Sequence, residues 1–368
     1  MGSRCFRHLI LIHKLCMMFR KYICLSIFIL VITSSGCGGI SYLFHAARGQ
    51  YRILSESVPL EEAIAQDIFD QRQKALINLV PEIKKFALEE LGLIAGDAYE
   101  KVYVGSELPP LYMVSVAPED KLALRTWWFP IAGSIPYLTF FDRESANKQA
   151  IEYREDNFDV FLGIVTAYST LGWFDDPIPR SMLEEDEAGF VETLIHEMTH
   201  TTIYFRGQGE FNESIASIIG KAGSLKFLRT KYGENHPSTI KAHNILQDQR
   251  IYSEFLSDLI EQLEKNYSSS SDREKKLLCK KNIFFESKNQ FSHISENFFT
   301  DRFVWFKDIE LNNAVILTMG LYDRNFMLFE KLLAKEGSEM AMINKIRNLA
   351  ESDELPVMES IRNYINQD

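Results

Sequence analysis

The chain has 368 residues, of which 46% are hydrophobic and 25% charged, with 19 Gly and 11 Pro. This composition is ordinary for a globular protein and excludes a low-complexity chain, and the length suffices for a substantial core. The formal net charge of −11 at pH 7 marks an acidic protein.

The first 36 residues differ from the rest of the chain. They contain five Lys and Arg, no Asp or Glu, an apolar run from Tyr22 to Ile32, and small residues just before Cys37. This order is typical of an export signal, and the apolar run is short for a spanning helix. The junction resembles a bacterial lipoprotein box, although Ser34 stands where Leu is usual. We therefore predict a signal peptide over 1–36 and lipidation of Cys37, with an uncleaved signal anchor as the alternative.

Cleavage at this point would change the charge and the cysteine inventory. The 40 Lys and Arg would fall by five while all 51 Asp and Glu would stay, so the net charge would go from −11 to −16. Such a charge argues against nucleic acid as a partner. Cys279 would be the one cysteine besides Cys37, which leaves no disulfide framework. The predicted location is the cell envelope, with the chain lipid-anchored to a membrane and facing the periplasm.

The mature chain, residues 37–368, is expected to form one domain with four parts. Residues 42–93 read as mostly helical, with helical spacing over 60–80 and over 81–91. Three runs rich in β-branched and aromatic residues then predict a small sheet; they are 111–116, 135–141 and 160–168. The four expected parts are helical 42–110, sheet 111–177, metal-binding helices 182–228 and helical 236–368.

The segment 187–205 is predicted to form a helix, because apolar residues recur at helical spacing, acidic residues crowd its start and glycines follow its end. Within it, His196, Glu197 and His200 form an H-E-x-x-H pattern. Residues four apart share a helix face, so the two imidazoles can bind one metal ion, with Glu197 beside them as a general base. The alternative is a pair of core histidines bonded to backbone carbonyls, which leaves the glutamate unexplained.

A catalytic zinc usually has three protein ligands and one open position. A second helix is predicted over 211–228, with Glu213 in its first turn and Glu210 in the preceding loop as candidate third ligands. We favour Glu213, because small residues follow it on the same helical face and would let the two helices approach closely. These residues are Ala216, Ser217 and Gly220. An acidic residue placed by the helix dipole alone is the alternative.

This site predicts hydrolysis with one Zn²⁺ per chain. Zinc lowers the pKa of a bound water, and Glu197 would accept its proton and pass it to the leaving amine. A further donor for the oxyanion is expected, and Tyr168 and Tyr204 are candidates, each equally compatible with simple packing. The run 163–172 reads either as a strand along the cleft that binds extended peptide or as a buried strand.

Helical patterns continue to the C-terminus, over 240–267, 275–287, 312–333 and 340–349. The expected fold class is α+β and predominantly α-helical. A small sheet would precede the H-E-x-x-H helix and a helical C-terminal half would follow it, the order seen in zincin-like metallopeptidases.

Several segments together resemble the bacterial putative aminopeptidase family of exported lipoproteins, of the glutamate-liganded zincin type. The resemblance covers most of the mature chain. Its segments are 47–50 with the preceding Cys37 and Tyr42, 129–133 with Pro136 and Tyr137, 167–177, 192–200, 211–214 and 312–314. It implies that His196, His200 and Glu213 bind zinc and that Glu197 is the base. The second His and the Glu are closer in sequence than in better-known zinc aminopeptidases, which affects the expected loop and substrate pocket.

Three hypotheses follow. The first is a membrane-anchored zinc peptidase, an aminopeptidase that hydrolyses peptides. The second is a zinc endopeptidase or amidase that acts on envelope material. The third is a catalytically silent, metal-binding envelope lipoprotein. The sequence determines neither the substrate nor the oligomeric state.

Overall fold

The computed structural model describes residues 37–94, 96–105, 111–129, 132–165, 167, 170, 175–352 and 356–367. The chain divides into two compact units, residues 1–52 and 53–368. The described part of the first unit lies in helix α2, Cys37–Ser55. The predicted signal peptide and the side chain of Cys37 lie outside the described part of the chain. In that part, no helix has the length and apolarity needed to cross a membrane.

The second unit is mostly helical and contains small antiparallel sheets, which confirms the expected α+β, predominantly α class. Its strands are β1 (Ser57–Pro59), β2 (Lys101–Tyr103), β3 (Leu111–Pro118), β4 (Trp127–Phe129), β5 (Gly133–Ile135), β6 (Leu138–Phe140) and β7 (Phe158–Val165). Its longer helices are α4 (Gln71–Leu91), α5 (Arg143–Glu155), α6 (Glu187–Thr202), α7 (Gly209–Tyr232), α8 (Pro237–Ser269), α9 (Arg273–Ile294), α10 (Asn313–Asp323), α11 (Phe326–Glu336), α12 (Glu339–Ser352) and α13 (Val357–Ile365).

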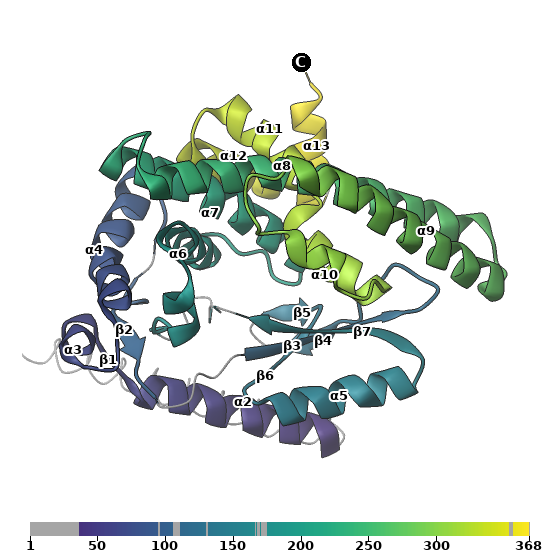
Figure 1. Ribbon diagram of the computed structural model, residues 1–368, viewed down its shortest axis with the longest axis horizontal. Coiled ribbons are helices and arrows are strands. Elements are labelled where there is room, and N and C mark those ends of the chain that lie inside the picture. The colour runs from purple at the N-terminus through teal and green to yellow at the C-terminus, as the bar shows by residue number, and fades with distance from the viewer. Residues whose placement is uncertain are drawn as a thin grey trace, which may run out of the picture. The chain divides into compact units, whose positions relative to one another are not determined.

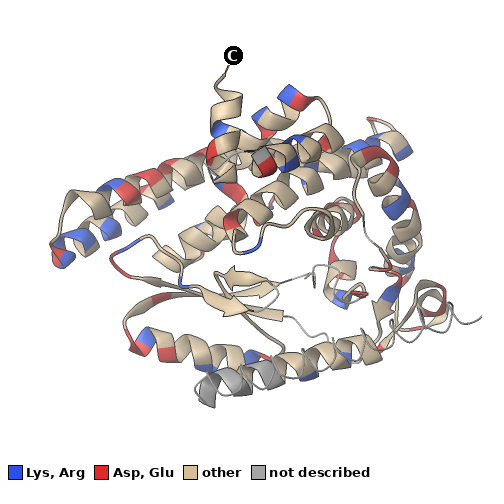
Figure 2. Cartoon of the chain, turned by 180° about the vertical axis from the view of Figure 1, so that it is seen from behind, with Lys and Arg blue, Asp and Glu red and all other residues tan. Residues whose placement is uncertain are grey.

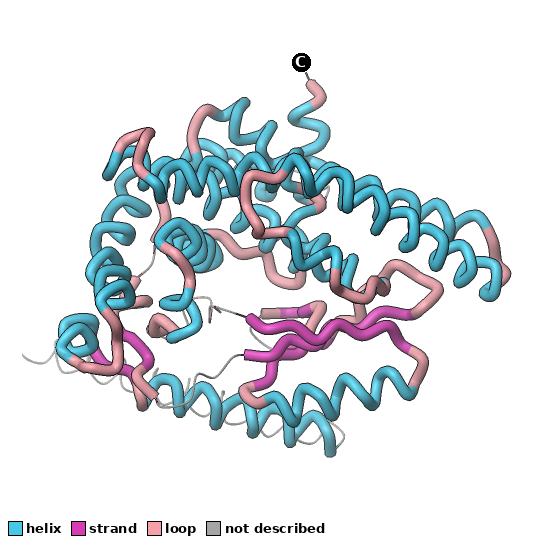
Figure 3. The backbone as a smooth tube through the Cα atoms, in the orientation of Figure 1, coloured by secondary structure: helices cyan, strands magenta, loops and turns pink. Residues whose placement is uncertain are grey.

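The largest sheet has the order β6-β3-β7, with all pairs antiparallel. Leu111 pairs with Val165 and Pro118 with Phe158, so β3 and β7 pair along their full length. Helix α5 packs on one face of this sheet and α10 on the other (Figure 1; Figure 3). Since β7 is an edge strand of this sheet, one side of its backbone is not paired within the sheet.

Two apolar cores stabilise the helical part. The main core joins α4, α6, α7, α11 and α12 around residues such as Ile83, Leu194 and Ile219. A second cluster between α8 and α9 surrounds Tyr252, whose ring stacks on Phe303 with centroids 4.2 Å apart. Charged residues are interleaved along the outer faces of α8 and α9 (Figure 2).

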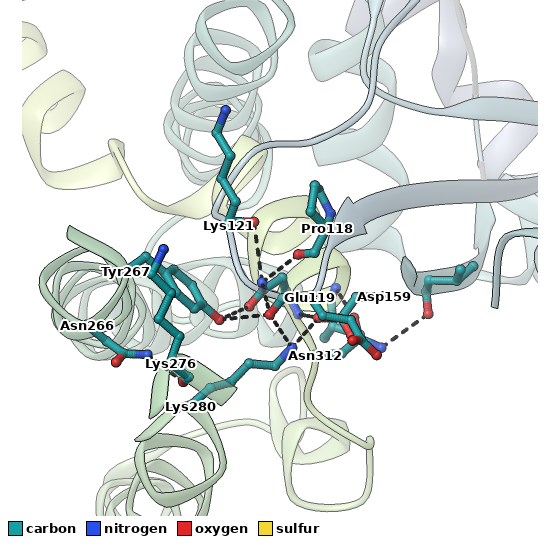
Figure 4. Close-up of polar contacts among 12 residues, drawn as sticks. Pro118, Glu119, Lys121, Asp159, Asn266, Tyr267, Lys276, Lys280 and Asn312 are labelled. Atoms are coloured by element: carbon teal, nitrogen blue, oxygen red, sulfur yellow. Dashed lines mark hydrogen bonds and ion pairs between the residues drawn. The ribbon is translucent and has the colours of Figure 1, made fainter. Parts of the chain in front are cut away.

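One asparagine joins the sheet to the helical half. The Asn313 amide donates to the carbonyls of Pro118, Glu119 and Lys121, at 2.9, 3.1 and 3.3 Å, and its oxygen accepts from the Tyr267 hydroxyl at 2.8 Å (Figure 4). Its backbone N–H donates to Asp159, which also accepts from a buried lysine, Lys280. The side chain of Asn312 caps α10 by accepting from the backbone N–H of Val315, and it donates to the carbonyl of Val160 on β7. These contacts fix where α10 begins, at the end of the β3–β7 pair.

The N-terminal prediction was partly wrong. A helix was expected over 60–80, but only Leu60–Ala65 forms a short helix, α3, and α4 starts at Gln71. Asp70 and Gln73 form a reciprocal capping box that starts α4 there. The second expected helix, 81–91, is the continuation of α4, since Pro81 lies inside it. Strand β1 was missed because its partner, β2, is more than 40 residues away in sequence.

Other boundaries also differ from the predictions. The run 135–141 is two strands, β5 and β6, on either side of Pro136. The expected helix 312–333 is broken into α10 and α11. The predicted helix 187–205 ends at Thr202, where the backbone becomes extended. Helix α5 was missed because only two alanines of its 13 residues are buried, which gives no apolar stripe.

Candidate active site

Helix α6 carries the H-E-x-x-H pattern. The side chain of Asp186 caps its first turn by accepting from the backbone N–H of Gly189 at 3.0 Å. Its apolar residues, including Val191, Leu194 and Met198, are buried in the main core. This burial fixes the rotation of the helix, which turns His196 and His200 to the same side.

Helix α7 packs closely against α6, as the small residues on its face predicted. A Cβ atom added at Gly220 would lie 3.0 Å from the Glu192 carbonyl oxygen and 3.2 Å from the Cβ of His196. Such distances are tighter than normal contacts, so a side chain there would force the helices apart. The absence of a side chain at Gly220 therefore lets α7 bring its carboxylate to the histidines.

His196, His200 and Glu213 come together in space, with one ligand atom of each within 4.8 Å of the others. The two Nε2 atoms are 3.2 Å apart, and the Glu213 Oε2 atom lies 3.3 Å from Nε2 of His196 and 3.4 Å from Nε2 of His200. All three side chains are largely buried. Three lone-pair donors facing one another away from water require a cation, either a proton or a metal ion.

The electrostatics of the three groups agree with that requirement. Burial alone would raise the pKa of Glu213, but the charge and hydrogen bonds of His200 and His196 hold this pKa well below its usual range. Burial likewise opposes charge on His200, and the neighbouring Glu213 outweighs it and raises the pKa of His200. Two imidazoles and one carboxylate are the donor set that zinc accepts in sites with an open position, so these residues fit that metal.

Glu197 lies next to His196 on α6 and is also largely buried. Burial raises the pKa of Glu197, the two histidines lower it in part, and Glu213 raises it further. A carboxylate with a raised pKa is a better proton acceptor at neutral pH than an ordinary surface glutamate. The position therefore suits the predicted base.

The other candidate ligand, Glu210, does not join the group. It lies in the first turn of α7 rather than in a loop, and its carboxylate accepts from the Asn325 side chain at 2.7 Å. Glu213 lies in the second turn rather than in the first. Since α7 begins at Gly209, two residues earlier than predicted, both glutamates lie on this helix, and the hydrogen bond from Asn325 engages the carboxylate of Glu210.

The residues on either side of Glu213 hold α7 in place. The Asn212 side chain accepts from the backbone N–H of Phe205 and donates to its carbonyl, both at 2.8 Å, which fixes the loop between α6 and α7. The Ser214 hydroxyl donates to the carbonyl of Leu321 on α10 at 3.0 Å. The Asn-Glu-Ser run thus joins the histidine helix, the carboxylate and α10.

Two tyrosines beside the site were not predicted from the sequence. The Tyr137 hydroxyl donates to the Oε1 atom of Glu213 at 3.4 Å. The ring of Tyr322, on α10, stacks on the His196 ring with centroids 6.2 Å apart. Burial, then the charge of Glu213, raises the pKa of both hydroxyls well above the usual value, so both remain protonated donors. In the sequence, Tyr137 is notable only as part of a segment on which the resemblance to the family rests.

Neither predicted oxyanion donor, Tyr168 or Tyr204, has a described contact with the three converging groups. The Tyr204 hydroxyl donates to the carbonyl of Ala132 at 3.1 Å, so it joins the α6–α7 loop to the β4–β5 hairpin. Tyr168 lies outside the described residues. Its proposed role remains a prediction.

An ion cluster around the buried carboxylate of Glu192 lies one turn before His196 on α6. Arg302 donates to both oxygens of Glu192, at 2.6 and 2.8 Å, and Lys221 on α7 lies 3.2 Å from the same carboxylate. Burial opposes the charge of Glu192, but the two cations lower its pKa to about 2. This cluster binds α6 to α7 next to the Gly220 contact.

A sequence model of the family described as "Putative aminopeptidase" matches residues 41–357. The chain belongs to this putative aminopeptidase family. The match includes α6, α7 and α10, so every residue of the site described above lies within the family region. No curated protein and no solved structure matches the chain.

Proposed function

We propose that this member of the putative aminopeptidase family is a zinc-dependent peptidase with a zincin-like catalytic domain in residues 37–368. The supporting observation is the convergence of His196, His200 and Glu213 next to the buried carboxylate of Glu197. The family assignment supports peptide hydrolysis, and the donor set supports zinc. Peptides are the proposed substrates, and removal of N-terminal residues is the proposed activity.

The proposed mechanism needs three metal ligands, one base and one oxyanion donor. His196, His200 and Glu213 would hold one zinc ion, which supplies Lewis-acid polarisation of the scissile carbonyl and a more acidic water. Glu197 accepts the proton of the attacking water and delivers it to the leaving amine. The ring of Tyr322 stacks on that of His196, and burial together with the charge of Glu213 raises the pKa of its hydroxyl, which stays protonated; it is proposed as the donor that stabilises the developing oxyanion.

Metal content tests the ligand set. The full-length chain, purified in detergent, should contain about one zinc per chain, and His196→Ala and Glu213→Ala should lose most of it. Glu210→Ala is the matched control, because its carboxylate binds Asn325 and should not affect the metal. Zinc that survives Glu213→Ala would refute the proposed third ligand. A wild-type chain that binds no zinc would refute the zinc-peptidase mechanism.

An endopeptidase or amidase that acts on envelope material is the second candidate. It is favoured by the position of β7 at an edge of its sheet, because an edge strand can pair with an extended peptide along its backbone. Peptides with free and with acetylated N-termini separate the two activities. Cleavage restricted to free N-termini supports the aminopeptidase, whereas equal cleavage of blocked peptides supports the endopeptidase.

We also propose that the chain is exported, lipidated at Cys37 and anchored to a membrane of the cell envelope. The support is the sequence of residues 1–37, with its basic start, apolar run and small residues before the cysteine. Cys37→Ser should prevent incorporation of radiolabelled palmitate and release the mature chain from the membrane fraction. Unchanged labelling of the variant would contradict this anchor.

A further inference from the structure

The two oxygens of the Glu213 carboxylate have different partners. Oε2 lies 3.3 Å and 3.4 Å from the Nε2 atoms of the two histidines, whereas Oε1 accepts from the Tyr137 hydroxyl at 3.4 Å. A carboxylate can bind a metal through one oxygen or through both. The partner of the second oxygen therefore decides how many positions around the metal the protein occupies.

Tyr137 reaches this carboxylate because the β4–β5 hairpin is held against the α6–α7 loop. The Ala132 carbonyl accepts both from the backbone N–H of Gly207, at 3.2 Å, and from the Tyr204 hydroxyl, at 3.1 Å. A Cβ atom at Gly133, whose φ is +81°, would lie 2.9 Å from the backbone nitrogen of Gly207. The hairpin and the loop thus have no room for a side chain between them, and Tyr137 follows directly after the hairpin.

We propose that Tyr137 is a positioning residue that keeps Oε1 of Glu213 away from the metal. Only Oε2 then faces the ion, and the fourth position stays open for water. This inference rests on the proposed zinc site and adds a role for a residue outside the ligand set.

Cobalt substitution of the full-length chain tests the inference without an activity assay. The visible absorption of Co²⁺ weakens when a fifth ligand joins a four-coordinate site, so it reports whether one or both oxygens bind. Tyr137→Phe should lower this absorption and weaken zinc binding about 10- to 100-fold, as loss of an outer hydrogen bond to a ligand does. Tyr364→Phe is the matched control, since it removes a tyrosine hydroxyl that donates to a carboxylate outside the site, that of Glu336 on α11.

A cycle with Glu213→Gln separates positioning from a general structural effect. If Tyr137 acts through the carboxylate, Tyr137→Phe should change zinc affinity much less in the Glu213→Gln background than in the wild type. A cobalt spectrum and a zinc affinity of Tyr137→Phe equal to those of the wild type would overturn the inference while leaving the proposed function intact. An equal loss of affinity in both backgrounds would also overturn it. A wild-type chain that binds neither metal would refute the proposed function itself.

Discussion

The ring of Tyr322 stacks on the imidazole of His196, with centroids 6.2 Å apart and planes 29° from parallel. The stack places a side chain of α10 against a predicted metal ligand of α6. Tyr322 can therefore affect the site in two separable ways, by packing against the histidine and by offering its hydroxyl.

Tyr322→Phe keeps the ring and removes the hydroxyl. If the hydroxyl stabilises the oxyanion, kcat should fall about 10²- to 10³-fold with little change in KM. Zinc content should stay at the wild-type level, because the ring still packs on His196. A loss of zinc in this variant would instead assign Tyr322 to the support of the metal site. Peptide kinetics and metal analysis on the same preparation distinguish the two results.

Glu197→Gln keeps the size of the side chain and removes its ability to accept a proton. Peptide hydrolysis should fall by about 10²- to 10⁴-fold, as for loss of a general base. Zinc affinity should be nearly unchanged, because Glu197 is not one of the three converging groups. Hydrolysis is measured as the rate of product release at saturating peptide. Full activity of Glu197→Gln would refute the hydrolytic mechanism.

The lowered pKa of Glu192 should make the free energy of unfolding depend on pH. Burial is outweighed by Arg302 and Lys221, so the pKa of Glu192 is about 2 in the folded chain, against a usual value of 4.5. Because the folded-state pKa is the lower one, the ionised carboxylate stabilises the fold above about pH 4.5, and this contribution is lost as the pH falls towards 2. Glu192→Gln should cost about 3 kcal/mol at pH 7, since the buried Lys221 and the partly exposed Arg302 lose their partner.

The difference between Glu192→Gln and the wild type should therefore shrink between about pH 4.5 and pH 2, as followed by denaturant unfolding monitored by circular dichroism. Glu261→Gln is the control, because that carboxylate is exposed and forms its ion pair with Lys265 on its own helix. A difference that stays constant down to pH 2 would contradict the lowered pKa.

Gly220→Val tests the close approach of the two site helices. A Cβ atom at this position would lie only 3.0 Å from the Glu192 carbonyl oxygen and 3.2 Å from the Cβ of His196, so the added side chain must displace α7 from α6. We expect a loss of about 1–3 kcal/mol in the free energy of unfolding and a weaker affinity for zinc. Zinc titration of the folded variant is the decisive measurement, and an unchanged affinity would mean that helix spacing does not set the ligand geometry.

Asn313→Ala removes the amide that joins the sheet to α10. Loss of its hydrogen bonds, at about 1 kcal/mol each, should reduce the free energy of unfolding by about 2–4 kcal/mol. Asn289→Ala, on the exposed face of α9, should have little effect and serves as the control. Equal stability of the two variants in urea would show that the carbonyls near Glu119 have other partners in the variant.

The local part of the site was readable from the sequence, and the rest was not. Helical periodicity places His196 and His200 on one face of α6, and a short loop with close helix packing brings Glu213 of α7 to them. Tyr137 and Tyr322 come from a segment before α5 and from α10, so their approach depends on the packing of distant elements. The spacing of apolar residues along the sequence does not reveal that these two tyrosines reach the site.

The same reason explains the errors in the fold. The break between α10 and α11 falls at Arg324 and Asn325, between apolar runs that on their own continue a helical pattern. The Asn325 side chain donates to Glu210 and accepts from Arg362, which are partners from two other helices. The start of α4 at Gln71 was in principle readable, since Asp70 and Gln73 have the spacing of a capping box.

The Asn313 contact also bears on the order in which the chain folds. Its partners in the segment after β3 precede it by more than 190 residues, and contacts of such sequence separation form slowly because a long loop must close first. A growing chain therefore contains both histidines and the carboxylate well before α10 can dock on the sheet. During that interval the proposed metal ligands would be open to solvent and to any available ion, and Tyr322 would reach His196 only when α10 docks.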